Sequence, residues 1–205
     1  PENLRPTIAK KIVQDQVSTG HPFSALVVPP LAAALELLHA QPEIVYVGDD
    51  PGLMEFRKDF GNAAYLFEER EPDHVEETDN TLKVQRKLQE DNDDRTNQKL
   101  TLRARLLDFI LGDWDRHEDN WRWLPIKDKD GDFYQPVPRD RDKVFYRTSG
   151  VFPWILSHQW LKSNLQPYSE TIRDVPGWNY NARFFDRYFL NGLSEADWIA
   201  EVKHV

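Results

Sequence analysis

The feature that most constrains the fold is an apolar helical stripe near the middle of the chain. Apolar residues recur there at intervals of three and four, at Leu100, Ala104, Leu107 and Leu111. This spacing places them on one face of an α-helix, and further apolar neighbours widen the face, so the helix should be deeply buried. Gly112 follows at once and predicts the helix end, because glycine adopts the left-handed C-terminal conformation without strain.

Short strands are predicted on both sides of this helix. Downstream, Trp121–Ile126 and Phe133–Val137 flank Asp130-Gly131, a dipeptide typical of tight hairpin turns. Upstream, Ile44–Val47 and Ala63–Phe67 are β-branched or aromatic and predict a second strand pair. Helices and short antiparallel hairpins together indicate an α+β fold.

Further helices are predicted from apolar periodicity and from end signals. A capping box of Ser194 and Asp197 opens a helix at the end of the chain. Pro29 and Pro30 interrupt one apolar stretch, so the helix there should begin after them. The charged segment Glu68–Asp94 predicts a solvated loop and an exposed helix. The remaining helical patterns cover Leu4–Val17, Leu31–Leu38, Ile155–Leu161 and Arg183–Leu190.

Composition limits the possible functions. The 205 residues suit one domain or a large piece of one, and the net charge of -9 argues against a nucleic acid partner. The absence of cysteine excludes disulfides and thiolate metal sites. No apolar run is long enough to predict a membrane span in this segment. The abrupt start suggests a fragment of a larger bacterial protein, which leaves localisation open between the cytoplasm and the bacterial cell envelope.

Polar residues with a recognisable spacing follow the central helix. Asp115 and Asn120 form an Asp-x-x-x-x-Asn pattern, and Asp140 comes after the second strand of the hairpin. Phosphoryl transfer needs a carboxylate near the attacking hydroxyl and oxygen ligands that hold magnesium against the phosphates. In a strand through residues 139–143, Asp140 and Asp142 would share one face and the intervening arginines the other. The pattern therefore predicts a metal-binding phosphotransfer site.

The motif DRHEDN at Asp115–Asn120 resembles the catalytic loop of phosphoinositide lipid kinases and of HipA-like toxin kinases. Trp114 before it and PRDRD at Pro138–Asp142 are similar to CotH-like spore-coat kinases. The resemblance implies an atypical kinase of the protein-kinase-like fold, mainly its larger, mostly helical lobe. On this basis, residues 1–70 are expected to be a remnant of the small lobe and residues 71–205 the large lobe.

The same resemblance implies roles for individual residues and the cofactors ATP and Mg²⁺. Asp115 would be the catalytic aspartate, and His117 would lie close to the transferred phosphate. Asn120 and Asp140 would be metal ligands, with Asp142 as a neighbour or substitute. The candidate hinge that meets adenine through backbone groups would be formed by Glu68, Glu69 and Arg70.

The chain also departs from the kinase pattern. It has no Gly-rich phosphate loop, no strand with a phosphate-binding lysine before the first helix, and Asp-Arg-Asp in place of Asp-Phe-Gly. Either the missing elements precede this segment in a longer protein, or the kinase is degenerate. The alternatives are a non-catalytic pseudokinase-like interaction module of a larger envelope or regulatory protein and, with less support, a metal-dependent hydrolase. The acceptor is left open among protein, lipid and small molecule.

Two structural roles are also expected. Arg116 is predicted to pair with a loop carboxylate rather than to contact phosphate. Five tryptophans are predicted to belong to the core: Trp121, Trp123, Trp154, Trp160 and Trp178.

Overall fold

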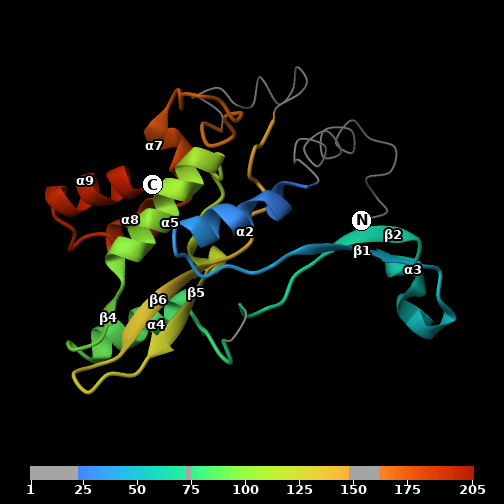
Figure 1. The fold of residues 1–205 in the computed structure, drawn as a ribbon, viewed down its shortest axis with the longest axis horizontal. Helices are drawn as coiled ribbons and strands as arrows, with labels where there is room; N and C mark the ends of the chain where they lie inside the picture. The colour runs from blue at the N-terminus through green and yellow to red at the C-terminus, as the bar shows by residue number, and fades with distance from the viewer. Residues whose placement is uncertain (1–22, 73–74, 148–161) are drawn as a thin grey trace.

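The computed structural model of the protein describes residues 23–72, 75–147 and 162–205 (Figure 1). The predicted helices Leu4–Val17 and Ile155–Leu161, together with Trp154 and Trp160, lie outside these residues. The described chain mixes helices with two small sheets, so the α+β class is confirmed. In these residues no helix has the length and apolar character needed to cross a bilayer.

The larger sheet is built on the predicted hairpin of β5 (Trp121–Ile126) and β6 (Phe133–Pro138). These strands are antiparallel, with Trp121 opposite Pro138. Two short strands complete the sheet order β3-β5-β6-β4: β3 (Asp79–Asn80) is antiparallel to β5, and β4 (Arg95–Thr96) is parallel to β6. The hairpin prediction is therefore confirmed and extended by two edge strands.

The central helix α5 spans Gln98–Leu111, as its apolar spacing predicts. Asn97 caps its start, because the side-chain oxygen of Asn97 accepts a hydrogen bond from the amide of Leu100 at 3.0 Å. Gly112 ends it with φ 69°, the left-handed conformation expected there. The defined end of the helix therefore fixes the position and direction in which the DRHEDN segment begins.

Aromatic stacking holds the helices against the sheet. Trp121 of β5 stacks on Phe185 of α8 (Arg183–Phe189) with ring centroids 4.3 Å apart, and Trp123 packs on Phe189 at 4.5 Å. The prediction that tryptophans belong to the core is confirmed for Trp121, Trp123 and Trp178, all of which are buried. Figure 1 shows α2, α5, α8 and α9 gathered on one side of the larger sheet.

Helix α2 spans Ser24–Ala34 and contains Pro29 and Pro30. The prediction that the helix begins after the prolines and runs over Leu31–Leu38 is therefore wrong. Each proline removes a backbone donor, but burial of apolar side chains along this helix outweighs the loss. Its residues share one core with α5, for example Ala32 with Leu107. The boundary predicted at residue 70 stays a prediction.

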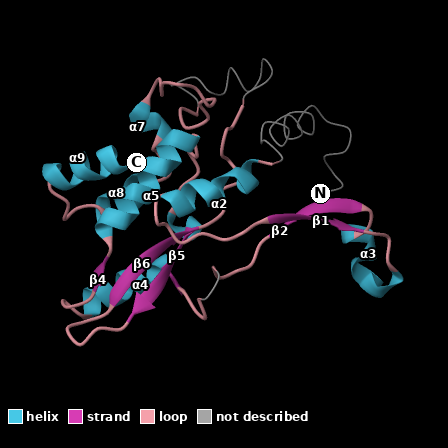
Figure 2. Ribbon diagram, in the orientation of Figure 1, coloured by secondary structure: helices cyan, strands magenta, loops and turns pink. Residues whose placement is uncertain are grey.

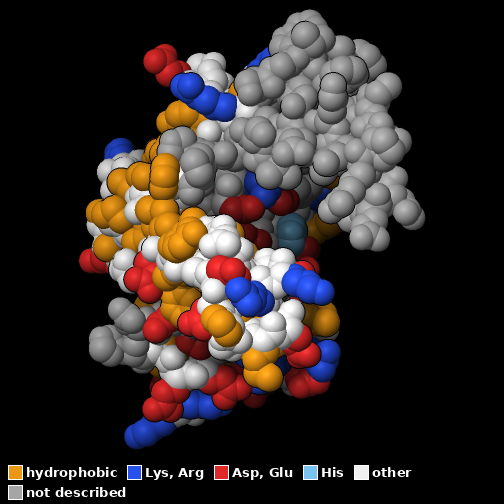
Figure 3. Space-filling model, turned by 90° about the vertical axis from the view of Figure 1, so that its right-hand side faces the viewer, with side chains coloured by type: hydrophobic (Ala, Val, Ile, Leu, Met, Phe, Trp, Pro, Cys, Tyr) orange, Lys and Arg blue, Asp and Glu red, His pale blue; other side chains and the backbone are white. Residues whose placement is uncertain are grey.

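The upstream strand pair is also confirmed. Strands β1 (Glu43–Val47) and β2 (Ala63–Phe67) are antiparallel, and the connection between them holds the turns η2 (Pro51–Phe56) and α3 (Arg57–Phe60). Figure 2 shows this unit reaching away from the rest of the protein as an arm. Its apolar side chains are largely exposed, Tyr46 at 69%, and Figure 3, which views this side, shows apolar and charged side chains interspersed at the surface.

The charged segment Glu68–Asp94 is less exposed than predicted. Helix α4 (Thr81–Glu90) buries Val84 completely against the core, and Asp79 before it is buried between Lys83 and Lys87. The expectation of an exposed helix is confirmed for the outer face of α4, where Leu82 is 64% exposed, but not for its inner face, where Thr81 and Val84 are buried. The C-terminal helices are α7 (Val175–Trp178), α8 and α9 (Glu195–His204), and the predicted capping box of α9 is present.

Candidate active site

The DRHEDN segment forms a compact loop between α5 and β5. Its last residues form a single 3-10 turn, η3 (Glu118–Asn120), which leads directly into β5. Asn120 is buried, and its Nδ2 donates a hydrogen bond to the backbone carbonyl of Asp115. Within the described chain, no hydrogen bond uses Oδ1 of Asn120. One end of this amide therefore closes the loop and the other keeps an oxygen for a ligand.

The carboxylate of Asp115 is held by a residue far away in the sequence. Nδ2 of Asn181 donates a hydrogen bond of 2.7 Å to Oδ1 of Asp115. Asn181 lies in the turn before α8, which is anchored in the core by Phe185. Sequence analysis missed Asn181, because it carries no motif and its contact depends on tertiary folding.

Asp140 and Asp142 are not arranged as predicted. Strand β6 ends at Pro138, and Asp140 has φ 54°, in the left-handed region. The alternation expected for a strand through residues 139–143 is therefore wrong. Arg141 is buried inside the protein, whereas the side chain of Asp142 is 53% exposed and pairs with Lys143. Aspartate tolerates the left-handed region better than most residues, which allows the chain to turn at Asp140.

The pKa of Asp140 depends on its burial and on two neighbouring carboxylates. Burial raises the pKa of Asp140, and the negative charges of Asp142 and Asp115 raise it further. Burial opposes the charge of Lys143, but its hydrogen bond to Asp142 and the charges of Asp115 and Asp140 leave its pKa raised. The carboxylates thus form an acidic group beside Lys143, a cation that no sequence motif indicates.

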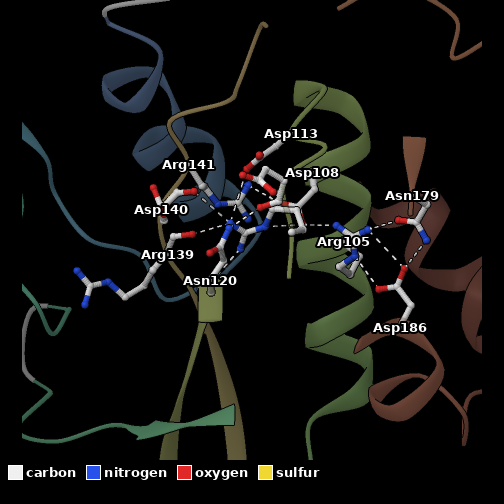
Figure 4. Close-up of polar contacts among 11 residues, drawn as sticks. Arg105, Asp108, Asp113, Asn120, Arg139, Asp140, Arg141, Asn179 and Asp186 are labelled. Carbon is white, nitrogen blue, oxygen red and sulfur yellow. Dashed lines mark hydrogen bonds and ion pairs between the residues drawn. The ribbon is translucent and has the colours of Figure 1, made fainter. Parts of the chain in front are cut away.

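Arg116 joins the two loops through the backbone. Its Nη1 donates to the carbonyl oxygens of Arg139 at 2.5 Å and Asp140 at 3.4 Å, and its Nη2 donates to that of Asn120 at 3.2 Å. The amide of Arg139 also donates to the carbonyl of Asn120 at 2.9 Å. Figure 4 shows Asn120, Arg139 and Asp140 on neighbouring segments. The backbone at two candidate metal ligands is therefore fixed by one side chain.

The structural role predicted for Arg116 is confirmed. The side chain is fully buried, with Nε 3.3 Å from Oδ2 of Asp108 and Nη1 3.7 Å from Oδ2 of Asp113. Its guanidinium carbon also lies 4.9 Å from the ring centroid of Trp121. A fully buried guanidinium with these partners cannot reach a phosphate without a large rearrangement.

His117 lies at the edge of the loop. It precedes η3, and its Nδ1 accepts a hydrogen bond of 3.3 Å from the amide of Asp119. The imidazole is 41% exposed. Among the described residues, none makes a hydrogen bond to its other ring nitrogen, and the role near a phosphate stays a prediction.

The oxygen donors here fit magnesium better than a metal that needs a complete protein cage. Among the residues that the structure describes, no three His, Cys, Asp or Glu side chains are grouped to hold a metal ion. Magnesium usually takes one or two carboxylates and completes its shell with water and substrate phosphates. The carboxylate of Asp140 and Oδ1 of Asn120 are oxygens of the type that magnesium takes, and Asp142 and Asp115 are close enough to Asp140 for their charges to raise its pKa.

The candidate hinge lies beside this group. Oε1 of Glu68 is 3.0 Å from Nη2 of Arg139, which also donates to the carbonyl of Glu69 at 3.4 Å. Arg70 is mostly exposed and pairs with Glu71.

A small pocket of about 30 Å³ separates the hinge from the second loop. Glu68, Arg139, Asp140 and Arg141 line it together with residues of α2 and of segment 39–42. Such a volume admits water but not a nucleotide. Nucleotide binding in this pocket would therefore require α2 or the hinge to move outward.

Comparison with models of protein families, with curated proteins and with solved structures gave no match for this chain.

Proposed function

We propose that this protein is the catalytic and metal-binding part of an atypical ATP- and Mg²⁺-dependent phosphotransferase with a protein-kinase-like large lobe. The observation that carries the proposal is the meeting of the loops at Asp115–Asn120 and Asp140–Asp142. Arg116 binds the backbone of both, and the charges of Asp142 and Asp115 help to raise the pKa of Asp140. The sequence motif and the geometry thus support the same residues by independent routes.

Each residue then has a definite task. Asp115, oriented by Asn181, accepts a hydrogen bond from the acceptor hydroxyl and takes up its proton as the phosphoryl group is transferred. Oδ1 of Asn120 and the carboxylate of Asp140 would hold magnesium, which neutralises phosphate charge when bound. Lys143 balances the negative charge of the group, and His117 approaches the phosphate from the exposed side of the loop. Glu68, Glu69 and Arg70 form the adenine side of the nucleotide site.

Calorimetry of ATP binding with and without Mg²⁺, combined with transfer of labelled γ-phosphate, tests the proposal. Asp140→Ala should lose the Mg²⁺-dependent part of ATP binding. Asp115→Ala should bind Mg²⁺·ATP as the wild type does but transfer no phosphate. Equal transfer by the wild type and both variants would remove these residues from the mechanism.

A non-catalytic, pseudokinase-like interaction module is the second candidate. The pocket of about 30 Å³ between the hinge and Asp140 favours it, because ATP does not fit there without movement. Failure of the wild type to bind ATP with Mg²⁺ at millimolar concentrations would select this candidate. Metal-dependent hydrolysis has less support, and release of phosphate without acceptor labelling would favour it.

A further inference from the structure

A buried carboxylate lies behind the two loops of the candidate site. Asp108 occupies the last turn of α5 and is fully buried. The same turn is anchored in the core by Leu107 and Leu111. An ionised group costs free energy when it leaves water, so its position in the core requires compensating charges.

Three arginines supply that compensation. Nη1 of Arg105 donates to Oδ2 of Asp108 at 2.6 Å, and Arg105 is fixed in turn by Asp186 and Asn179. Nε of Arg116 lies 3.3 Å from the same oxygen, and Nη1 of Arg141 lies 2.6 Å from Oδ1. Figure 4 shows the guanidinium groups of Arg105 and Arg141 directed towards Asp108. The charges of the arginines hold the pKa of Asp108 below its usual range despite burial.

Two of these arginines come from different parts of the site. Arg116 directly follows Asp115, and Arg141 stands between Asp140 and Asp142. One carboxylate on a rigid helix therefore contacts both loops. Movement of either loop would break an ion pair in surroundings that exclude water.

We propose that Asp108 is a positioning residue that sets the two loops of the site relative to each other through Arg116 and Arg141. It touches neither nucleotide nor metal and acts only through these guanidinium groups. The role of Asp108 in catalysis rests on the proposed function. The coupling of the two loops through Asp108 can be tested independently of that function.

Hydrogen exchange at defined amides measures the coupling. The amide of Asn120 donates to the carbonyl of His117 at 3.1 Å, and that of Arg139 donates to the carbonyl of Asn120 at 2.9 Å. Asp108→Asn should accelerate exchange at both amides by about ten-fold or more, relative to amides in the middle of α9. Unchanged exchange at both, or a change at only one, would overturn the proposal.

Asp79→Asn provides the matched control. Asp79 is also buried and paired, but with Lys83 and Lys87 of α4. When the variants are compared at equal loss of global stability, Asp79→Asn should change exchange at both amides by the same factor as at the reference amides of α9. The same acceleration in Asp79→Asn would show that Asp108 has only a general structural role.

A narrower variant serves if Asp108→Asn does not fold. Arg141→Met removes one ion pair and keeps Arg105 and Arg116 on Asp108. It should accelerate exchange at Arg139 and at Phe145, whose amide donates to the carbonyl of Leu111, and leave Asn120 unchanged within two-fold. Equal protection of Arg139 in this variant and the wild type would contradict the role of Arg141.

Binding of Mn²⁺ alone, measured by electron paramagnetic resonance, tests whether Asp108 affects the metal affinity of the candidate site. Asp108→Asn should weaken Mn²⁺ binding by about ten-fold or more, because residues that orient metal ligands typically have effects of this size. Asp79→Asn should bind as the wild type does. Wild-type protein that binds no Mn²⁺ would defeat the proposed function, and the exchange data would then decide alone whether Asp108 couples the loops. Normal Mn²⁺ affinity in Asp108→Asn would overturn its role in the site.

Discussion

Asn181 and Asp115 are joined by a hydrogen bond of 2.7 Å, although they are far apart in the sequence. The amide of Asn181 occupies one oxygen of the carboxylate and leaves the other available. The contact also ties the DRHEDN loop to the turn before α8. The orientation of the candidate catalytic aspartate is therefore set by the C-terminal helices rather than by its own loop.

Replacement of Asn181 should lower phosphotransfer without loss of nucleotide affinity. A hydrogen bond to a charged group contributes about 1.5–3 kcal/mol, so Asn181→Ala should reduce turnover roughly ten-fold or more. Asn181→Asp should be worse, because a second carboxylate would repel Asp115. Exposed Asn191 provides the control, and Asn191→Ala should have wild-type turnover. Steady-state kinetics check this, and wild-type turnover in Asn181→Ala would refute the orienting role.

Asp113 should make the protein less stable at neutral pH than at mildly acidic pH. Burial raises the pKa of Asp113 to about 6. The positive charge of Arg116 opposes this shift, and the negative charge of Asp108 adds to it. The folded state thus binds this proton more tightly than the unfolded state, whose pKa is near 3.8. The loss of folding stability that comes from ionising Asp113 in the folded state is fully present above pH 6 and disappears below pH 3.8.

Asp113→Asn removes this cost. The variant should be about 1–3 kcal/mol more stable than the wild type at pH 8, and the difference should shrink towards zero near pH 4. Urea unfolding of the wild type and the variant at several pH values measures this difference in the free energy of unfolding. A constant difference across this range would show that the carboxyl group does not titrate as described.

Asp79 should have the opposite pH dependence. Burial alone would raise its pKa, but the hydrogen bonds and charges of Lys83 and Lys87 lower it below 3.8. The pairing of Asp79 with the two lysines therefore stabilises the fold above pH 3.8, and this stabilisation is lost as the pH falls through the pKa of Asp79 in the folded state. Asp79→Asn should cost about 1–3 kcal/mol at pH 7 and much less at pH 2–3. Denaturant titrations at both pH values check this, and an equal cost at both would contradict the pairing.

Gly112 should not tolerate a side chain. Its φ is 69°, and a Cβ atom there would lie 2.8 Å from Cδ2 of Tyr168. Gly112→Ala should therefore destabilise the protein by about 1–3 kcal/mol. Gly48→Ala is the control, because no atom lies within 4 Å of a Cβ built there, and it should change stability by less than about 0.5 kcal/mol. Equal melting temperatures of the two variants would disprove the steric argument.

Local sequence signals predicted the framework of the site. The apolar stripe and Gly112 defined α5, and Asp130-Gly131 identified the β5–β6 hairpin, because helix ends and tight turns depend on residues close in sequence. The spacing of Asp115 and Asn120 also identified the loop between these elements. Helix α2 was misjudged because tertiary burial outweighed the local effect of Pro29 and Pro30.

The arrangement of side chains in the site was harder to predict. Alternation of Arg and Asp suggested a strand after Pro138, but the chain turns at Asp140 once Arg116 binds its carbonyl and Arg141 enters the core. The contact of Asn181 with Asp115 and the charge cluster around Asp108 join segments distant in sequence. Such contacts follow from the packing of α8 and α5 and leave no local signal.

The central claim, that Asn120 and Asp140 hold one divalent cation beside Asp115, is tested most directly by paramagnetic broadening in NMR spectra. Substoichiometric Mn²⁺ is added to ¹⁵N-labelled protein, with the exposed acidic residues Asp91 and Asp93 as an internal control. The account predicts that the side-chain amide of Asn120 and the backbone amides of Asp115 and Asp140 broaden together and first. Broadening that begins at Asp91 and Asp93 and leaves those three signals sharp would contradict it.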